Sequence, residues 1–318
     1  MKANLYLHAD TLKYNGTDSE EVFNDKFTSL LNDLNEIRNQ YGDNNTIVVS
    51  SSLSDGTVTL FEDKSIYDIA QTLDYEEKNF VYALMYNTSN VSDASLAEIE
   101  KKCVYDENET ECNSVIYLNR PNPPKLSYPI EYISFDRYEI VYGKDSWHTV
   151  RRQIMGNHPG TPHDFMEECK IHFPNIVFSS NCETSIVGYL DLVPRKIVYY
   201  LSCMNDKLLN HMRTTSTSDE NTLLADFCGL YGFDEAGTRQ GTPKKKEFYQ
   251  YRFLKQGCSD LPKNYKRITC DPHMKMSSCD SNCRKAPKGF AGRIYFHFGD
   301  SEIAKDKILV GSIGPHVC

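Results

Sequence analysis

The sequence contains little tryptophan and no long apolar run. Only one of its 318 residues is tryptophan, and no hydrophobic stretch approaches the roughly 18 residues that a membrane-spanning helix needs. The first residues show neither an apolar segment nor a small-residue cleavage site, so no secretory signal is expected. Internal repeats and low-complexity tracts are also missing, which excludes repeat architectures. These absences predict a globular protein of the cytoplasm with no membrane partner.

The cysteines support the same prediction. The chain has 11 of them, an odd number without a regular framework, and this pattern favours reduced thiols in a cytoplasm over disulfides. The composition, 40% hydrophobic and 25% charged, is typical of folded soluble proteins. A chain of 318 residues is long enough for two or three domains with their own cores.

Charge is distributed very unevenly along the chain. Residues 242–318 hold 15 Lys and Arg against 7 Asp and Glu, a net charge of +8, whereas residues 1–241 hold 20 against 37, a net charge of −17. A basic segment on an acidic body is expected when one end of a protein meets a polyanion. The alternative is that the basic and acidic parts bind one another.

The patterns of apolar residues divide the chain into three segments and predict an α+β fold. In residues 1–120, strands at 4–8, 46–50 and 115–118 alternate with helices, the clearest of which spans 22–37, so an acidic α/β domain is expected. Three prolines in residues 119–125 predict a domain boundary. The net charge of the sequence changes from negative to positive near residues 237–246, which predicts a second boundary.

Residues 121–241 are expected to form a mixed α/β region with two long helices. Thr161 and Pro162 are typical of a helix start, and a second helix is predicted from Pro194 to about Met212. Residues 242–318 are expected to form a basic, β-rich module that interacts with nucleic acid, with strands near 248–253, 293–298 and 307–313.

A cysteine-rich stretch within that module resembles a zinc-binding pattern. Cys270 and His273 form one pair of candidate ligands, and Cys279 and Cys283 form a second pair at a similar spacing. Neither pair is the stronger Cys-x₂-Cys knuckle, so unliganded thiols are the alternative. Apart from this candidate zinc, no cofactor is expected.

Basic residues alternate with aromatic residues through the same module. Lys and Arg neutralise phosphates, and aromatic rings stack on the bases of single-stranded nucleic acid. We therefore predict that the module binds nucleic acid, with RNA favoured. The expected contacts are Lys244, Lys245, Lys246, Arg252, Lys263, Arg284, Lys285 and Lys288.

The predicted strand at 293–298 has one polar face. Strand alternation puts Ile294, Phe296 and Phe298 on one face, which must be core, and Arg293, Tyr295 and His297 on the other. His316 follows the next strand, and a hairpin could bring it near this row.

The end of the chain is predicted to form a strand, a charged turn and a second strand that ends in Gly311–His316 (GSIGPH). This pattern resembles the last two strands of RelE/ParE-type toxins. In that family the sheet presents Arg, Lys, Tyr and His to RNA for cleavage. The resemblance implies that Arg293 corresponds to the arginine of the penultimate strand and His316 to the histidine near the end.

Cleavage would then proceed without metal, by attack of a ribose 2′-hydroxyl on the adjacent phosphate. In this hypothesis Tyr295 or Lys266 is the general base, Arg293 and Arg267 stabilise the charged phosphate, and His297 or His316 is the acid.

These patterns lead to two hypotheses. The first is a nucleic-acid-acting effector, a metal-independent endoribonuclease of a prokaryotic toxin or phage-defence system, whose acidic body is regulatory or binds a protein partner. The alternative is a non-catalytic nucleic-acid-binding or adaptor subunit of a larger assembly.

Overall fold

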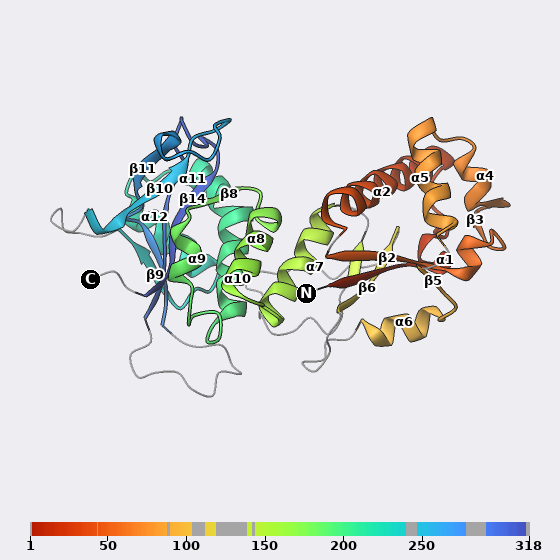
Figure 1. The fold of residues 1–318 in the computed structure, drawn as a ribbon, viewed down its shortest axis with the longest axis horizontal. Helices are drawn as coiled ribbons and strands as arrows, with labels where there is room; N and C mark the ends of the chain where they lie inside the picture. The colour runs from red at the N-terminus through yellow and green to blue at the C-terminus, as the bar shows by residue number, and fades with distance from the viewer. Residues whose placement is uncertain are drawn as a thin grey trace. The chain divides into compact units, whose positions relative to one another are not determined.

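The structure is a computed structural model that describes residues 2–42, 44–87, 90–103, 112–118, 139–141, 144–239, 247–277 and 291–315. The chain divides into two compact units, and the elements of each are shown in Figure 1. Unit 1 comprises Met1–Lys125 with Ser134–Ile154, and unit 2 comprises Leu126–Ile133 with Met155–Cys318. Helices and strands both contribute to each unit, which confirms the predicted α+β class.

Unit 1 is built on a five-stranded parallel sheet in the order β5-β2-β1-β6-β7. The central strand is followed in the chain by strands on one side and then on the other, the arrangement of a doubly wound α/β sheet. The strands are β1 (Ala3–Leu7), β2 (Asn45–Ser50), β5 (Val91–Ser92), β6 (Cys112–Tyr117) and β7 (Glu139–Val141).

Helices cover both faces of this sheet. The long helix α2 (Glu20–Tyr41) and α5 (Tyr75–Met85) lie over one face, and α6 (Leu96–Lys102) lies over the other (Figure 1). Most apolar residues of α2 recur at steps of three and four and are buried, as the sequence predicts, whereas Val22 in its first turn is exposed. The remaining elements of unit 1 are α1 (Ala9–Leu12), α3 (Ser51–Ser54), the hairpin β3 (Thr59–Phe61) and β4 (Lys64–Ser65), α4 (Ile66–Ala70), and α7 (Lys144–Asn157), within which the division between the units falls.

Unit 2 contains a second five-stranded sheet, in the order β8-β14-β13-β12-β9. Its neighbours pair antiparallel except for β8, which runs parallel to β14. The strands are β8 (Ile176–Phe178), β9 (Glu235–Thr238), β12 (His273–Met276), β13 (Gly292–His297) and β14 (Ile308–Pro315).

Two different layers cover this sheet. Helices pack one face and form a large core with Ile294 and Phe296 of β13 and with Ile308, Val310 and Ile313 of β14. The other face is covered by the hairpin of β10 (Gln250–Leu254) and β11 (Tyr265–Thr269), which forms a smaller core with Tyr295 and Leu309. The helices are α8 (Pro162–His172), α9 (Asn181–Ser185), α10 (Pro194–Cys203), a π-helical turn (Met204–Leu208), α11 (Leu209–Thr214) and α12 (Glu220–Leu230), and a 3₁₀ turn (Pro262–Asn264) precedes β11.

The two units do not follow the three predicted segments. Strands β8 and β9, from residues 121–241, share a sheet with β12, β13 and β14, from residues 242–318. The physical reason is that the apolar face of β13 and β14 needs the helices of the middle segment to cover it. The basic segment is therefore part of unit 2 rather than a separate module. None of the helices in the described ranges combines the length and apolarity that crossing a membrane requires.

Candidate nucleic-acid interface

The predicted polar row on β13 is interrupted by a buried tyrosine. Tyr295 is completely buried, because the hairpin β10–β11 lies over it. Its ring centroid lies 5.2 Å from those of Tyr249 and His273. Tyr249, Tyr251 and Phe253 alternate along the hairpin and give it an apolar face, which is stable only against another apolar surface. This burial corrects the expectation that Tyr295 is open to a substrate as a general base.

Lys266 is held in an ion-pair cluster at the turn between β13 and β14. Its Nζ lies 2.8 Å from Asp300 Oδ2 and 2.7 Å from Glu302 Oε1. The hydrogen bonds to Asp300 and then to Glu302 raise the pKa of the Lys266 ammonium. A lysine that is kept protonated does not accept a proton, so the structure also corrects the general-base role predicted for Lys266.

The other predicted catalytic residues that the structure describes lie at different places in unit 2. Arg293 donates from Nη1 to the neighbouring carbonyl oxygen of Gly292, at 2.8 Å. His297 lies at the far end of β13 and is partly buried. Arg267 lies on the hairpin, in β11. His316 is outside the described residues.

Half of the predicted zinc ligands can be located. The Cys270 thiol is buried and points towards the carbonyl oxygens of Leu309 and Ile268, at 3.9 and 4.0 Å, and burial raises its pKa. Both ring nitrogens of His273 have oxygen neighbours, since Nδ1 lies 3.2 Å from the Asp271 carbonyl and Nε2 lies 3.4 Å from the Thr238 hydroxyl. Cys279 and Cys283 are outside the described residues, and within those residues no group of three or more candidate ligands comes together.

The outer face of the hairpin brings two arginines directly opposite each other. In the register of β10 and β11, Arg252 pairs with Arg267, and both side chains are exposed. Like charges in directly opposed positions of an antiparallel pair are destabilising. Neither arginine has an ion-pair partner among the residues that the structure describes. An anion bound between them would remove this repulsion.

A tyrosine completes the same surface. The guanidinium carbon of Arg252 lies 4.9 Å from the centroid of the Tyr265 ring, a cation–π contact. Arg252 Nη2 also donates to the Pro262 carbonyl at 3.4 Å, and the Tyr265 hydroxyl donates to Asp260 at 2.8 Å. These contacts hold the two side chains over the strands. We call Arg252, Lys263, Tyr265 and Arg267 the hairpin arginine face; Lys263 is exposed in the 3₁₀ turn before β11.

Other basic residues of unit 2 form ion pairs with carboxylates. Lys255 and Lys266 both pair with Glu302, and Arg239 pairs with Asp271 and Glu220. These cations are already neutralised, so they offer less to a phosphate than the hairpin arginine face does. Six of the predicted nucleic-acid contacts lie outside the described residues: Lys244, Lys245, Lys246, Arg284, Lys285 and Lys288.

The sequence indicates each arginine but not their opposition. Arg252 and Arg267 both belong to the basic segment, yet the sequence predicts different roles for them, one in binding and one in catalysis. Their pairing depends on the hairpin register, which the spacing of 14 intervening residues does not specify. No protein-family model, curated protein or solved structure matches this chain.

Proposed function

We propose that this protein binds single-stranded nucleic acid, with RNA as the expected ligand, through the hairpin arginine face. The observation that carries the proposal is the direct opposition of Arg252 and Arg267 without a carboxylate partner among the described residues. Each arginine can donate to phosphate oxygens, and a backbone phosphate between them would relieve their repulsion.

Tyr265 and the geometry of the β-hairpin favour single-stranded over double-stranded nucleic acid. Single-stranded ligands are bound by basic strands whose aromatic side chains stack on unpaired bases. Tyr265 stands on the same face as the two arginines and is partly exposed. The charge of +8 in residues 242–318 would attract a polyanion to this end of the chain.

The proposal is for binding without cleavage. The two residues predicted as general bases do not support catalysis, since Tyr295 is buried beneath the hairpin and Lys266 is paired with two carboxylates. The non-catalytic hypothesis from the sequence is therefore the one that the geometry favours.

Binding can be measured by fluorescence anisotropy with a labelled RNA of mixed sequence, the DNA of the same sequence and the corresponding duplex. We expect the double variant Arg252→Gln/Arg267→Gln to weaken RNA binding and to reduce the slope of log K against log salt by about 2, one for each lost phosphate contact. The matched control is Lys101→Gln/Lys102→Gln, which removes two charges from the last turn of α6 in unit 1. This control should retain the affinity and slope of the parent protein.

Two results would overturn the proposal. Equal loss of affinity in the hairpin and control variants would mean that binding follows net charge rather than this surface. Cleavage of the RNA by the parent protein, abolished by Tyr295→Phe in a folded protein, would restore the catalytic hypothesis.

A further inference from the structure

One edge of the sheet in unit 1 is only partly paired. Strand β5 pairs with β2 at two positions, Val49 with Val91 and Ser50 with Ser92. No described strand pairs with the preceding residues of β2, 45–48, on that side. The backbone donors and acceptors of an edge strand that point outward can pair with an added strand.

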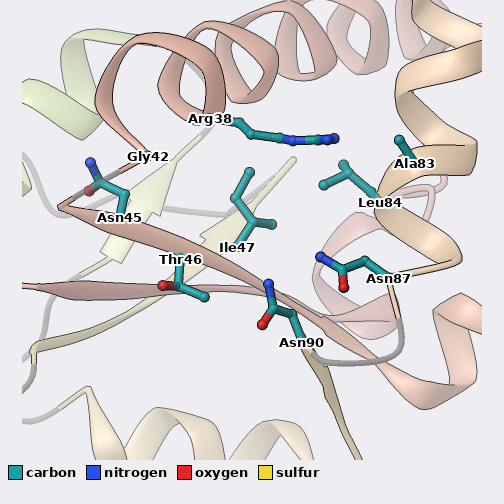
Figure 2. A pocket seen from close by; sticks show the side chains of 9 residues that line it. All are labelled: Arg38, Gly42, Asn45, Thr46, Ile47, Ala83, Leu84, Asn87 and Asn90. Atoms are coloured by element: carbon teal, nitrogen blue, oxygen red, sulfur yellow. The ribbon is translucent and has the colours of Figure 1, made fainter.

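A cleft of about 210 Å³ opens beside these residues, between the ends of α2 and α5 (Figure 2). Ile47 and Leu84 form its apolar part, and the amides of Asn87 and Asn90 lie around it. Thr46 lines the cleft together with Ile47, although neighbouring residues of a strand point to opposite faces. The cleft therefore passes around the edge of β2.

Arg38 supplies one positive charge to this cleft. Its side chain extends from α2 over Ile47 in Figure 2, and its guanidinium carbon lies 5.7 Å from the centroid of the Phe80 ring. Within the described part of the chain, no carboxylate forms an ion pair with Arg38. A guanidinium without a counterion above an apolar floor suits the carboxylate of a short aliphatic acid.

We propose that the open edge of β2 binds an extended peptide segment of a partner protein, with one glutamate side chain of that segment in the cleft. The peptide backbone would add a strand beside residues 45–48, with which no described strand pairs on that side. The methylene groups of the glutamate would contact Ile47 and Leu84, and its carboxylate would accept hydrogen bonds from Arg38. The Asn90 amide can donate to and accept from the added backbone.

The size of the cleft favours a side chain over a free small molecule. Pockets for small molecules usually enclose about 300–1,000 Å³. This cleft holds about 210 Å³ and is lined partly by the strand itself. The residues that flank the glutamate should be neutral or basic, because residues 1–125 hold 22 Asp and Glu against 10 Lys and Arg.

A random peptide library displayed on phage, selected against the full-length protein, tests this site. We expect enriched peptides to share one glutamate within an alternating, β-prone segment. Synthetic copies should bind about tenfold more weakly, by anisotropy, when glutamine replaces that glutamate, because a charge-assisted hydrogen bond is lost. N-methylation of the backbone amides on one edge of the peptide should also abolish binding.

The protein variant Arg38→Gln should bind the glutamate and glutamine peptides equally, whereas the control Lys101→Gln should keep the preference of the parent. Both variants should bind RNA like the parent protein, so this test is independent of the proposed function. The proposal would be overturned if selection against the parent protein enriched no glutamate peptides beyond those enriched by the Arg38→Gln variant. Peptide binding that survives N-methylation would also overturn it. So would N-acetylglutamate that binds as tightly as the whole peptide, because this would indicate a small-molecule site.

Discussion

The ring of Tyr251 lies directly against the backbone of Gly311. A Cβ atom built at Gly311 would stand 2.2 Å from Cδ2 of that ring, closer than any real contact. Gly311 is also the extra residue at the register shift between β13 and β14, where Tyr295 pairs with Ser312 and Phe296 with Val310. The hairpin can therefore pack on the sheet only because this position lacks a side chain.

The first prediction follows from this contact. Gly311→Ala should lower the free energy of unfolding by about 1–3 kcal/mol, the usual cost of overpacking, because Tyr251 is buried and its ring has little room to move. Urea denaturation followed by circular dichroism measures the change. The matched control is Gly229→Ala in α12, where the added Cβ meets no atom within 4 Å. The control should be neutral or stabilising by up to about 1 kcal/mol, because alanine favours a helix over glycine. Equal effects of the two substitutions would contradict the close contact.

The second prediction separates the two faces of the hairpin. Tyr295→Ala should cost about 3–5 kcal/mol of unfolding free energy, because it removes a fully buried aromatic ring from the core beneath the hairpin. Arg267→Ala, on the exposed outer face, should change stability by less than about 0.5 kcal/mol. The same denaturation measurement compares them. A small effect of Tyr295→Ala would mean that the hairpin does not cover the sheet in solution.

The third prediction concerns a buried lysine in unit 2. Lys196 is fully buried, and its Nζ lies 2.9 and 2.7 Å from the two carboxylate oxygens of Asp234. Asp234 also accepts a hydrogen bond from the backbone N–H of Ser277, at 2.9 Å. Asp234→Ala should cost about 3–5 kcal/mol, since it leaves a buried ammonium without its carboxylate. Chemical denaturation gives this value directly.

A second substitution provides the control for this pair. Adding Lys196→Met to Asp234→Ala removes the buried charge as well, so the double variant should be more stable than Asp234→Ala alone. A double variant less stable than Asp234→Ala would show that Lys196 stabilises the fold by contacts other than this ion pair.

Local signals in the sequence were sufficient to predict many elements. The helix start at Thr161 and Pro162 is confirmed, with the Thr161 hydroxyl accepting a hydrogen bond from the Asp164 N–H. The predicted helix from Pro194 is confirmed too, although a π-helical turn divides it. Each of these depends on residues that are close together in the chain.

The candidate sites were harder to predict because they depend on residues that are far apart in the chain. Alternation correctly separated Ile294 and Phe296 from Tyr295, but it could not show that a hairpin formed some 30 residues earlier covers Tyr295. The cleft beside β2 left no signal, because Arg38 occupies the polar side of an ordinary amphipathic helix. It becomes a candidate only because β5 is short.

The last prediction concerns acid. The carboxylate of Glu302 lies 2.7 Å from the ammonium groups of both Lys255 and Lys266, and hydrogen bonds from Lys255 and Lys266 lower the pKa of Glu302 from 4.5 to about 2. Because the pKa is lower in the folded state, the cluster stabilises the fold above the unfolded value near 4.5, and this contribution is lost as the pH falls towards about 2. Glu302→Gln should therefore be less stable than the parent at neutral pH, and the difference should shrink across this interval. The pH dependence of the urea midpoint at low ionic strength measures this difference, and high salt should reduce it because these charges are exposed.

The matched control, Glu247→Gln, changes an exposed glutamate of unit 2 that forms no ion pair within the described ranges. The urea midpoints of this control should run parallel to those of the parent. A constant gap between Glu302→Gln and the parent down to pH 2 would show that the lysines do not hold this carboxylate in solution.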